Sequence, residues 1–324
     1  MTPTPPPFDT ELDAVLRAME AEGGTLSDLS AEGIAAARQM LDAAAPDDEQ
    51  LSHQGYFEVE DRVVPGPEGA PGVSLLICRP VASGGPRPVI YHVHGGGMVI
   101  GNNRSGVDMV VDWARELDAV VVSVEYRLAP QHPHPAPIED VYAGLVWTAG
   151  HAREIGGDPE RIVIAGASAG GGLAAGLALL LRDRKGARPA GQLLMGPMLD
   201  DRNDTPSARQ MQGLGIWDRT ANESGWTALL GDRRGGPDVS PYAAPARAED
   251  LSGLPPVYLD VGSAETFRDE VVTYASRLWQ AGEVAELHVW PGGFHGFEGF
   301  APQTALARTA VAARLNWLRR LLAE

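Results

Sequence analysis

Hydrophobic and polar positions follow two different periods along this chain. From about residue 88 onward, short runs rich in β-branched residues alternate with longer stretches whose apolar residues recur at helical spacing. Strands that are apolar almost throughout and alternate with helices predict a mostly parallel sheet covered by helices on both faces. Functional residues are therefore expected at the carboxyl ends of the strands, where sites lie in such sheets.

The pattern predicts about eight strands and, after residue 88, five helices. The predicted strands are 56–64, 73–79, 88–94, 119–125, 161–165, 190–195, 254–261 and 284–290, and the predicted helices are 107–117, 138–152, 168–184, 267–280 and 305–322. The first two strands are expected to pair in an antiparallel way, because the residues between them, 65–72, are rich in Pro and Gly. No internal repeat interrupts this order.

Two segments do not fit the alternation. Residues 1–50 contain apolar residues at helical spacing and a second helical stretch, 31–45, with Ser30 as its expected N-cap. Residues 198–250 look irregular, with many Gly and Pro residues, and an insertion of this length in a compact domain is usually a lid or binding region. We therefore predict an N-terminal helical cap segment over 1–50 and a main domain over 51–324. Residues 198–250 are predicted to form a second cap segment, opposite the first.

Composition and charge narrow the class of protein. The 324 residues are 44% hydrophobic and 21% charged, which is typical of a globular protein with a substantial core. A net charge of −17 argues against nucleic-acid and anionic-membrane partners. The single cysteine, Cys78, cannot form an internal disulfide and is expected to be buried in a strand. Because neither a signal peptide nor an apolar run of ~18 residues is visible, we expect a cytoplasmic protein without a membrane span.

A candidate nucleophile lies in a short turn between a predicted strand and a predicted helix. The turn reads Gly166-Ala167-Ser168-Ala169-Gly170, a Gly-x-Ser-x-Gly sequence. In the nucleophile elbow, a sharp strand-to-helix turn exposes the serine hydroxyl, and small flanking residues let the strand and helix approach closely. The context of this turn therefore predicts that Ser168 is a nucleophile.

A run of glycines follows an earlier strand. His94-Gly95-Gly96-Gly97 stands at the end of the strand predicted over 88–94. The glycines could simply form a tight loop. Alternatively, they bring backbone N–H groups close to an oxyanion, as the HGGG loop does in enzymes with a nucleophile elbow. His94 is expected to hold this loop in shape.

A histidine and a carboxylate that could activate the serine come late in the chain. His295 follows the last predicted strand, in the order serine, acid, histidine that is typical of a nucleophile elbow. Glu265 comes directly after the strand predicted over 254–261 and is the favoured acid, with Asp269, one turn into the next helix, as the alternative. Asp260 lies within the strand and is expected to be too deep.

Several stretches together resemble the bacterial hormone-sensitive-lipase-like carboxylesterases of the α/β-hydrolase fold. They are residues 94–97, 125–130, 136–140, 166–170, 268–270 and the loop around His295, and the resemblance covers about 88–297. It implies that Ser168 is the nucleophile, that His295 is the base, and that the N–H groups of Gly96, Gly97 and Ala169 form an oxyanion hole. It also implies a cap built from the N-terminal helices and suggests a homodimer.

The sequence departs from this family at two positions. Ala167 stands where the family often has Asp before the nucleophile, and Glu265 stands where the family usually has Asp as the acid. A glutamate is longer by one methylene, yet it can reach the same imidazole nitrogen. The acid is therefore the member of the site that departs from the family.

These residues predict a serine carboxylesterase that forms an acyl-enzyme on Ser168 and needs no metal or organic cofactor. The resemblance suggests a small, short-chain ester as the substrate. The candidate pocket residues, which could equally be core residues, are Met195, Met198, Leu214, Ile216 and Trp217.

Other functions are compatible with parts of this sequence. A lactonase, amidase or carbamate hydrolase would use the same three residues, and a non-catalytic ligand-binding protein would be expected to lack one of them. Nucleotide binding at the glycines that follow Ser168 is disfavoured. A dinucleotide-binding loop has Gly where Ser168 stands, and a P-loop has Lys where Gly172 stands.

Overall fold

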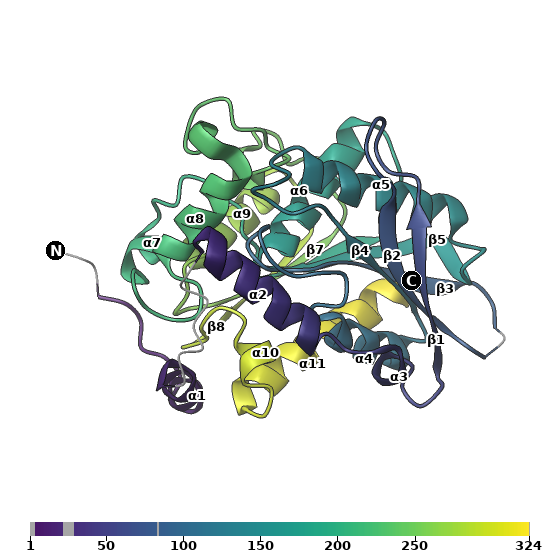
Figure 1. The fold of residues 1–324 in the computed structure, drawn as a ribbon, viewed down its shortest axis with the longest axis horizontal. Coiled ribbons are helices and arrows are strands. Elements are labelled where there is room, and N and C mark those ends of the chain that lie inside the picture. The colour runs from purple at the N-terminus through teal and green to yellow at the C-terminus, as the bar shows by residue number, and fades with distance from the viewer. Residues whose placement is uncertain (1–3, 22–28, 83, 324) are drawn as a thin grey trace.

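An eight-stranded sheet runs through the centre of the molecule (Figure 1). The computed structural model describes residues 4–21, 29–82 and 84–323. The strands are β1 (Phe57–Val64), β2 (Val73–Pro80), β3 (Arg87–Val93), β4 (Val120–Glu125), β5 (Gly157–Ala167), β6 (Gly191–Met195), β7 (Val257–Gly262) and β8 (Ala285–Trp290). Their order in the sheet is β1-β2-β4-β3-β5-β6-β7-β8. The pairs β1–β2 and β2–β4 are antiparallel and the others parallel, which confirms the predicted mostly parallel sheet.

Helices cover both faces of the sheet and extend beyond it at the N-terminus. The helices are α1 (Thr10–Ala21), α2 (Ala31–Ala44), α3 (Asp48–Leu51), α4 (Val107–Leu117), α5 (Ala136–His151), α6 (Ala169–Asp183), α7 (Pro206–Gln210), α8 (Arg219–Leu230), α9 (Arg268–Gln280), α10 (Phe297–Phe300) and α11 (Ala305–Leu322). The described residues also form two short 3₁₀ turns, Gly231–Arg233 and Pro245–Arg247. The five helices predicted after residue 88 begin and end within two residues of their observed bounds.

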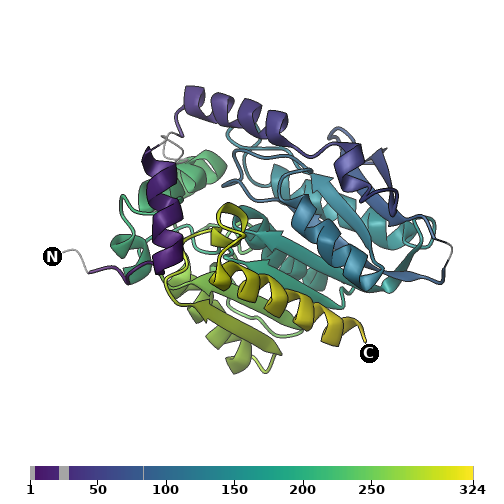
Figure 2. The ribbon, with the colours of Figure 1, turned by 90° about the horizontal axis from the view of Figure 1, so that it is seen from below.

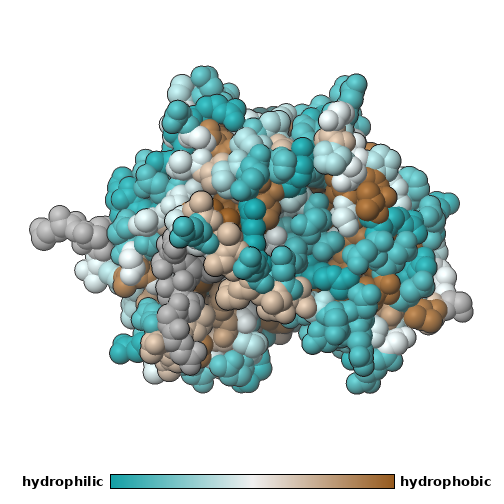
Figure 3. Space-filling view, in the orientation of Figure 1, coloured by the Kyte–Doolittle hydropathy of each residue, from teal (hydrophilic) through white to brown (hydrophobic). Residues whose placement is uncertain are grey.

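The polarity of the surface and of the helices is what the composition predicts. The face seen in Figure 1 is mostly hydrophilic, and its hydrophobic residues form small separate groups (Figure 3). Among the described residues, no helix combines the length and the apolarity that crossing a bilayer would require. Cys78 is buried in β2, as predicted, and burial raises the pKa of its thiol to about 12.

Side chains of the central strands alternate between two layers of core. In β3, Val89, Tyr91 and Val93 belong to the cluster that includes α5, α6 and α9, whereas Ile90 belongs to the cluster that includes α4 and α11. Every residue of this strand is buried. Burial on both faces explains why the central strands are apolar without interruption, as the sequence pattern indicated.

The central strand β5 begins four residues earlier than predicted. Arg87 of β3 pairs with Gly157, and the register then shifts before Val89 pairs with Ile162. The intervening residues, 158–161, are polar or proline, so they carry no apolar signal of a strand. The strand ends at Ala167, which puts the next residue at the carboxyl edge of the sheet, near its middle.

The N-terminal segment packs over this carboxyl edge. Helix α2 begins as predicted, since the hydroxyl of Ser30 accepts a hydrogen bond from the amide of Gly33 at 3.1 Å. Helix α1 buries Leu12 and Leu16 in one cluster with Phe294 and Phe297, which flank the His295 position. Figure 2 shows α1 and α2 (purple) at the rim of the molecule, where the carboxylate of Glu11 in α1 accepts a hydrogen bond from the amide of Ala305, at the start of α11 (yellow), at 2.8 Å.

Residues 198–250 are more regular than predicted, because they contain the 12-residue helix α8. The carboxylate of Asp218 caps this helix by accepting a hydrogen bond from the amide of Ala221 at 2.8 Å. Thr, Asn, Ser and Gly give α8 a weak intrinsic helical preference, so the burial of Trp226 and Leu229 accounts for its formation. The sequence pattern alone therefore did not indicate it.

The two predicted cap segments meet one another. Ile216 lies in the same hydrophobic cluster as the buried leucines of α1. The side chain of Gln210 in α7 also donates a hydrogen bond to the carbonyl of Thr4 at 2.8 Å. The two segments, which were predicted to lie opposite one another, are therefore in contact at these residues.

Candidate active site

Ser168 occupies the sharp turn between β5 and α6, as the Gly-x-Ser-x-Gly sequence predicted. Its backbone has φ 57° and ψ −123°, a strained conformation for a residue with a side chain. Three hydrogen bonds fix its peptide groups: its N–H donates to the carbonyl of Met195 at 2.8 Å, and its carbonyl accepts from the N–H groups of Met198 at 2.9 Å and Gly172 at 3.0 Å. At Gly166 a Cβ atom would lie 2.3 Å from the carbonyl oxygen of Gly170, so the close approach of β5 and α6 requires glycine.

The structure brings His295 and Glu265 to this serine. The Nε2 atom of His295 lies 2.9 Å from the hydroxyl of Ser168, and its Nδ1 atom lies 3.1 Å from Oε1 of Glu265. The other carboxylate oxygen accepts a hydrogen bond from the N–H of Gly262 at 3.1 Å, and Phe267 packs edge-on against the imidazole. A carboxylate beside Nδ1 favours the tautomer with its proton there, which leaves Nε2 free to accept the serine proton.

The two other candidate carboxylates have different partners. Asp260 forms a buried ion pair with Arg314, in which the guanidinium Nε lies 2.7 Å from the carboxylate. Asp269 pairs with Arg268 at 2.7 Å and accepts a hydrogen bond from the amide of Ser207 at 2.7 Å. Asp260 therefore lies too deep for the site, as the sequence indicated, and Asp269, the alternative acid, is paired with Arg268 and not with His295.

The glycine loop after β3 lies against the nucleophile. A Cβ atom at Gly95 would be 3.5 Å from the Cβ of Ser168. Gly96 and Gly97 have φ values of 107° and 61°, which favour glycine. Among residues 4–21, 29–82 and 84–323, none accepts a hydrogen bond from the amides of these two glycines. Ala169 is the first residue of α6, where helix N–H groups have no partner within the helix.

His94 shapes this loop from within the core. Its Nδ1 atom lies 2.8 Å from the carbonyl oxygen of Gly95, and its ring stacks on Tyr126 at a centroid distance of 4.1 Å. The hydroxyl of Tyr126 donates to the carbonyl of His94 at 2.9 Å. Burial lowers the pKa of His94 to about 4, so the ring is neutral at neutral pH. Sequence reasoning missed the role of Tyr126, although this residue lies in one of the stretches that carried the family resemblance.

Trp217 packs directly on the glycine loop. A Cβ atom at Gly97 would lie 2.3 Å from the Trp217 ring. The indole N–H donates to Asn222 at 3.3 Å, and the carbonyl of Trp217 accepts a hydrogen bond from the hydroxyl of Thr266 at 2.7 Å. Because Thr266 follows Glu265 in the chain, the 198–250 segment is tied both to the glycine loop and to the loop that carries the acid.

The remaining pocket candidates differ in their surroundings. Met198 and Ile216 are buried, and Met198 is in the same core cluster as the Trp217 ring. Leu214 is 37% exposed. Met195 belongs to the core on the α4 and α11 side of the sheet, which favours the packing interpretation for that residue.

The chain belongs to the α/β-hydrolase family. The family described as alpha/beta hydrolase fold matches residues 90–299, about two thirds of the chain, and this stretch includes the serine, acid and histidine described above. The match agrees with the observed sheet, in which five parallel pairings follow the two antiparallel ones. The resemblance to hormone-sensitive-lipase-like hydrolases that the sequence motifs indicated is therefore confirmed.

Individual relatives align over most of the chain. Carboxylesterase NlhH of Mycobacterium tuberculosis is 34% identical over 318 residues, which is 96% of this chain and 97% of that protein. Esterase LipI of the same species is 37% identical over 82% of this chain and 83% of its own length. Among solved structures, a bacterial heroin esterase is 39% identical, with a TM-score of 0.88 over 97% of this chain and 98% of that chain. Esterase LipW from Mycobacterium marinum is 33% identical with a TM-score of 0.85, over 99% of both chains.

Proposed function

We propose that this chain is a serine carboxylesterase in which Ser168, His295 and Glu265 form the catalytic triad. Its class, carboxylic ester hydrolase, follows from relatives with 34% and 37% identity over most of the chain and from its family. The observation that carries the assignment of residues is the continuous chain of contacts from Glu265 through His295 to the serine hydroxyl, at 3.1 Å and 2.9 Å.

The first half of the reaction forms an acyl-enzyme. The Ser168 oxygen attacks the ester carbonyl carbon while Nε2 of His295 takes the hydroxyl proton. Glu265 holds the imidazole and stabilises the positive charge that it gains. When the tetrahedral intermediate collapses, the bond to the alcohol oxygen breaks and the same proton passes to the departing alcohol. The acyl group then remains on the serine oxygen.

The second half regenerates the enzyme with water. His295 takes a proton from a water molecule, whose oxygen attacks the acyl carbon, and the proton returns to the serine oxygen as the acid leaves. The amides of Gly96, Gly97 and Ala169 are proposed to donate hydrogen bonds to the carbonyl oxygen whenever it carries negative charge. Removing one such donor typically costs about 3 kcal/mol of transition-state stabilisation.

A small ester with a short acyl chain is the proposed substrate. Trp217 supports this proposal, because its ring lies against Gly97 and so limits the space beside the proposed oxyanion hole. Met198 and Ile216 are proposed to line the same pocket, with Leu214 nearer to solvent. A series of nitrophenyl esters of increasing acyl length tests this preference directly.

Residues 1–50 and 198–250 are proposed to act together as a cap over the catalytic domain. Three contacts support this proposal: α1 packs on the residues that flank His295, Arg38 of α2 donates to the carbonyl of Val99 at 2.8 Å beside the glycine loop, and Trp217 covers Gly97. The homodimer and the cytoplasmic location stay predictions. Size-exclusion chromatography with light scattering tests the first, and cell fractionation tests the second.

The function is tested by replacing the nucleophile. Ser168→Ala is expected to reduce the release of nitrophenol from a short-chain ester by at least ~10⁴-fold, because, within the described part of the chain, no other hydroxyl is hydrogen-bonded to His295. Ser276→Ala, on the exposed side of α9, is the matched control and is expected to retain full activity. Undiminished hydrolysis by Ser168→Ala would remove the serine-esterase assignment.

A further inference from the structure

The turn between β6 and α7 touches every member of the triad. Met195 and Met198 hold the two peptide groups of Ser168, as described above. Between them, a Cβ atom at Gly196 would lie 3.4 Å from the imidazole of His295 and 3.5 Å from the carboxylate of Glu265. A displacement of this turn would therefore change the position of the serine relative to its base.

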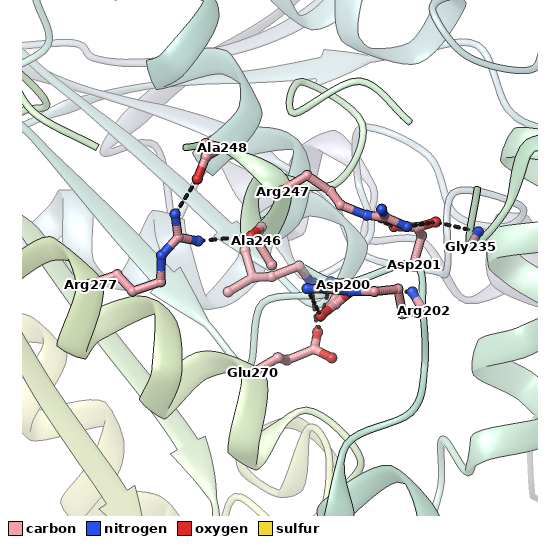
Figure 4. A network of polar contacts seen from close by, with 10 residues as sticks. Asp200, Asp201, Arg202, Gly235, Ala246, Arg247, Ala248, Glu270 and Arg277 are labelled. Atoms are coloured by element: carbon pink, nitrogen blue, oxygen red, sulfur yellow. Dashed lines mark hydrogen bonds and ion pairs between the residues drawn. The ribbon is translucent and has the colours of Figure 1, made fainter. Parts of the chain in front are cut away.

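Glu270, on the first turn of α9, holds the far end of this turn. Its Oε1 atom accepts hydrogen bonds from the amide of Leu199 at 2.7 Å and from the amide of Asp200 at 3.3 Å. Figure 4 shows the Glu270 side chain reaching from α9 to the backbone at Asp200. The Glu270 side chain is 3% exposed, so water does not readily replace it as the acceptor for these amides.

The next residue, Asp201, is held in place by other residues of the 198–250 segment. Asp201 accepts hydrogen bonds from the guanidinium of Arg247 at 2.7 Å and from the amide of Gly235 at 2.6 Å (Figure 4). Asp200 pairs with Arg202 within the segment itself. Glu270 is therefore the group that ties the turn to α9, the helix that begins three residues after Glu265.

We propose that Glu270 is a positioning residue for the esterase reaction, which acts through Leu199 and Asp200 to hold the Met195–Met198 turn, and with it Ser168, against His295. The role rests on the proposed function, since it concerns the same serine and histidine. Glu270 links the turn after β6 to the start of α9, the helix that follows the Glu265 loop. The residues joined by these hydrogen bonds, Leu199 and Asp200, are not themselves catalytic. A misplacement of about 1 Å from a remote substitution lowers a catalytic rate about 100-fold.

The chemistry of Glu270 provides a conservative variant. Burial raises the pKa of its carboxyl well above the usual range, and Oε1 alone accepts the hydrogen bonds from the two amides. The second oxygen, Oε2, has no hydrogen-bond partner among the described residues. Glu270→Gln therefore keeps the carbonyl oxygen that the amides require, whereas Glu270→Ala removes it.

The experiment compares kcat and KM for a short-chain nitrophenyl ester in Glu270→Ala, Glu270→Gln and Leu278→Ala. Leu278 is a buried residue near the end of α9, and its truncation lowers the melting temperature without touching the turn. Glu270→Ala is expected to lower kcat ~10- to 100-fold with little change in KM. Glu270→Gln is expected to retain most of the wild-type kcat. Leu278→Ala is expected to leave kcat unchanged, when all variants are assayed at a temperature where each is folded. If Glu270→Ala does not fold, Glu270→Asp withdraws the oxygen by one methylene and makes the same comparison.

A second readout keeps this proposal separate from the ester assignment. Labelling of Ser168 by a fluorophosphonate forms an oxygen–phosphorus bond, breaks the phosphorus–fluorine bond and transfers the serine proton to His295, so its rate reports the alignment of the two residues on any substrate. Slower labelling in Glu270→Ala with recovery in Glu270→Gln supports the positioning role even if the wild-type chain hydrolyses no ester tested. Wild-type kcat and labelling in Glu270→Ala would overturn the role. Equal impairment of Glu270→Gln, or of Leu278→Ala, would also overturn it.

Discussion

Two buried carboxylates, those of Asp260 and Glu265, lie near the end of β7 and face different partners. Asp260, within the strand, faces Arg314, whose guanidinium also pairs with Glu298 at 2.8 Å. Glu265, in the loop that follows, faces the imidazole of His295. Both carboxylates line a single cavity of about 40 Å³ beneath the nucleophile. Their exposed fractions are 1% and 3%, so burial does not distinguish them.

The partner decides what each carboxylate does. The guanidinium of Arg314 is permanently charged, so the pair with Asp260 cannot exchange a proton and serves to join α11 to β7. Burial raises the pKa of Asp260, and Arg314 opposes that rise. The imidazole beside Glu265 can accept and return a proton in a reaction, and its other nitrogen faces the hydroxyl of Ser168. One pair is therefore suited to stability and the other to catalysis.

The largest effect is expected from the carboxylate that faces the imidazole. Glu265→Ala removes the group that orients and stabilises His295, and we expect kcat for a short-chain ester to fall ~10³- to 10⁴-fold. The unfolding midpoint in urea should change far less than it does when Arg314 is replaced. Activity within ten-fold of the wild type would contradict the role of Glu265. The two carboxylates would then not differ in their importance for catalysis.

The next effect concerns stability. Arg314→Met leaves the buried Asp260 and the partly buried Glu298 without their cation, and we expect a loss of about 3–5 kcal/mol in the free energy of unfolding. The double variant Asp260→Leu with Arg314→Met removes the pair and should recover part of this loss. Urea unfolding followed by circular dichroism measures both. A single variant as stable as the wild type would show that the pair does not hold α11 in place.

The smallest effect is expected at Asp269, the other candidate acid. Its pair with Arg268 is partly exposed, with exposed side-chain fractions of 27% and 18%, so the pair is worth about 1 kcal/mol or less. Asp269→Asn also keeps an oxygen for the amide of Ser207. Activity is expected to stay within about five-fold of the wild type in the same ester assay. A greater loss here than in Glu265→Ala would reassign the triad acid.

The sequence alone was sufficient to predict a feature wherever the residues of one short stretch determine its conformation. The elbow is of this kind, because a Cβ atom at Gly166 would lie 2.3 Å from the carbonyl oxygen of Gly170, four residues on, and Ser168 stands at the apex of the turn. The apolar strands and the order serine, acid, histidine along the chain predicted the parallel sheet and the loops that hold the site. Glu265 was favoured over Asp260 and Asp269 for the same reason, namely its place directly after a strand.

The tertiary structure alone decided which residues meet across the chain. Arg314 reaches Asp260, Trp217 packs on Gly97, and Glu270 binds the amides of Leu199 and Asp200, in each case across more than 50 residues of sequence. Helix α8 likewise forms through burial, against the weak helical preference of its residues. A sequence pattern records the period and the polarity of each segment. It does not record which distant side chain supplies the partner for a buried polar group, because only the packed fold brings the two together.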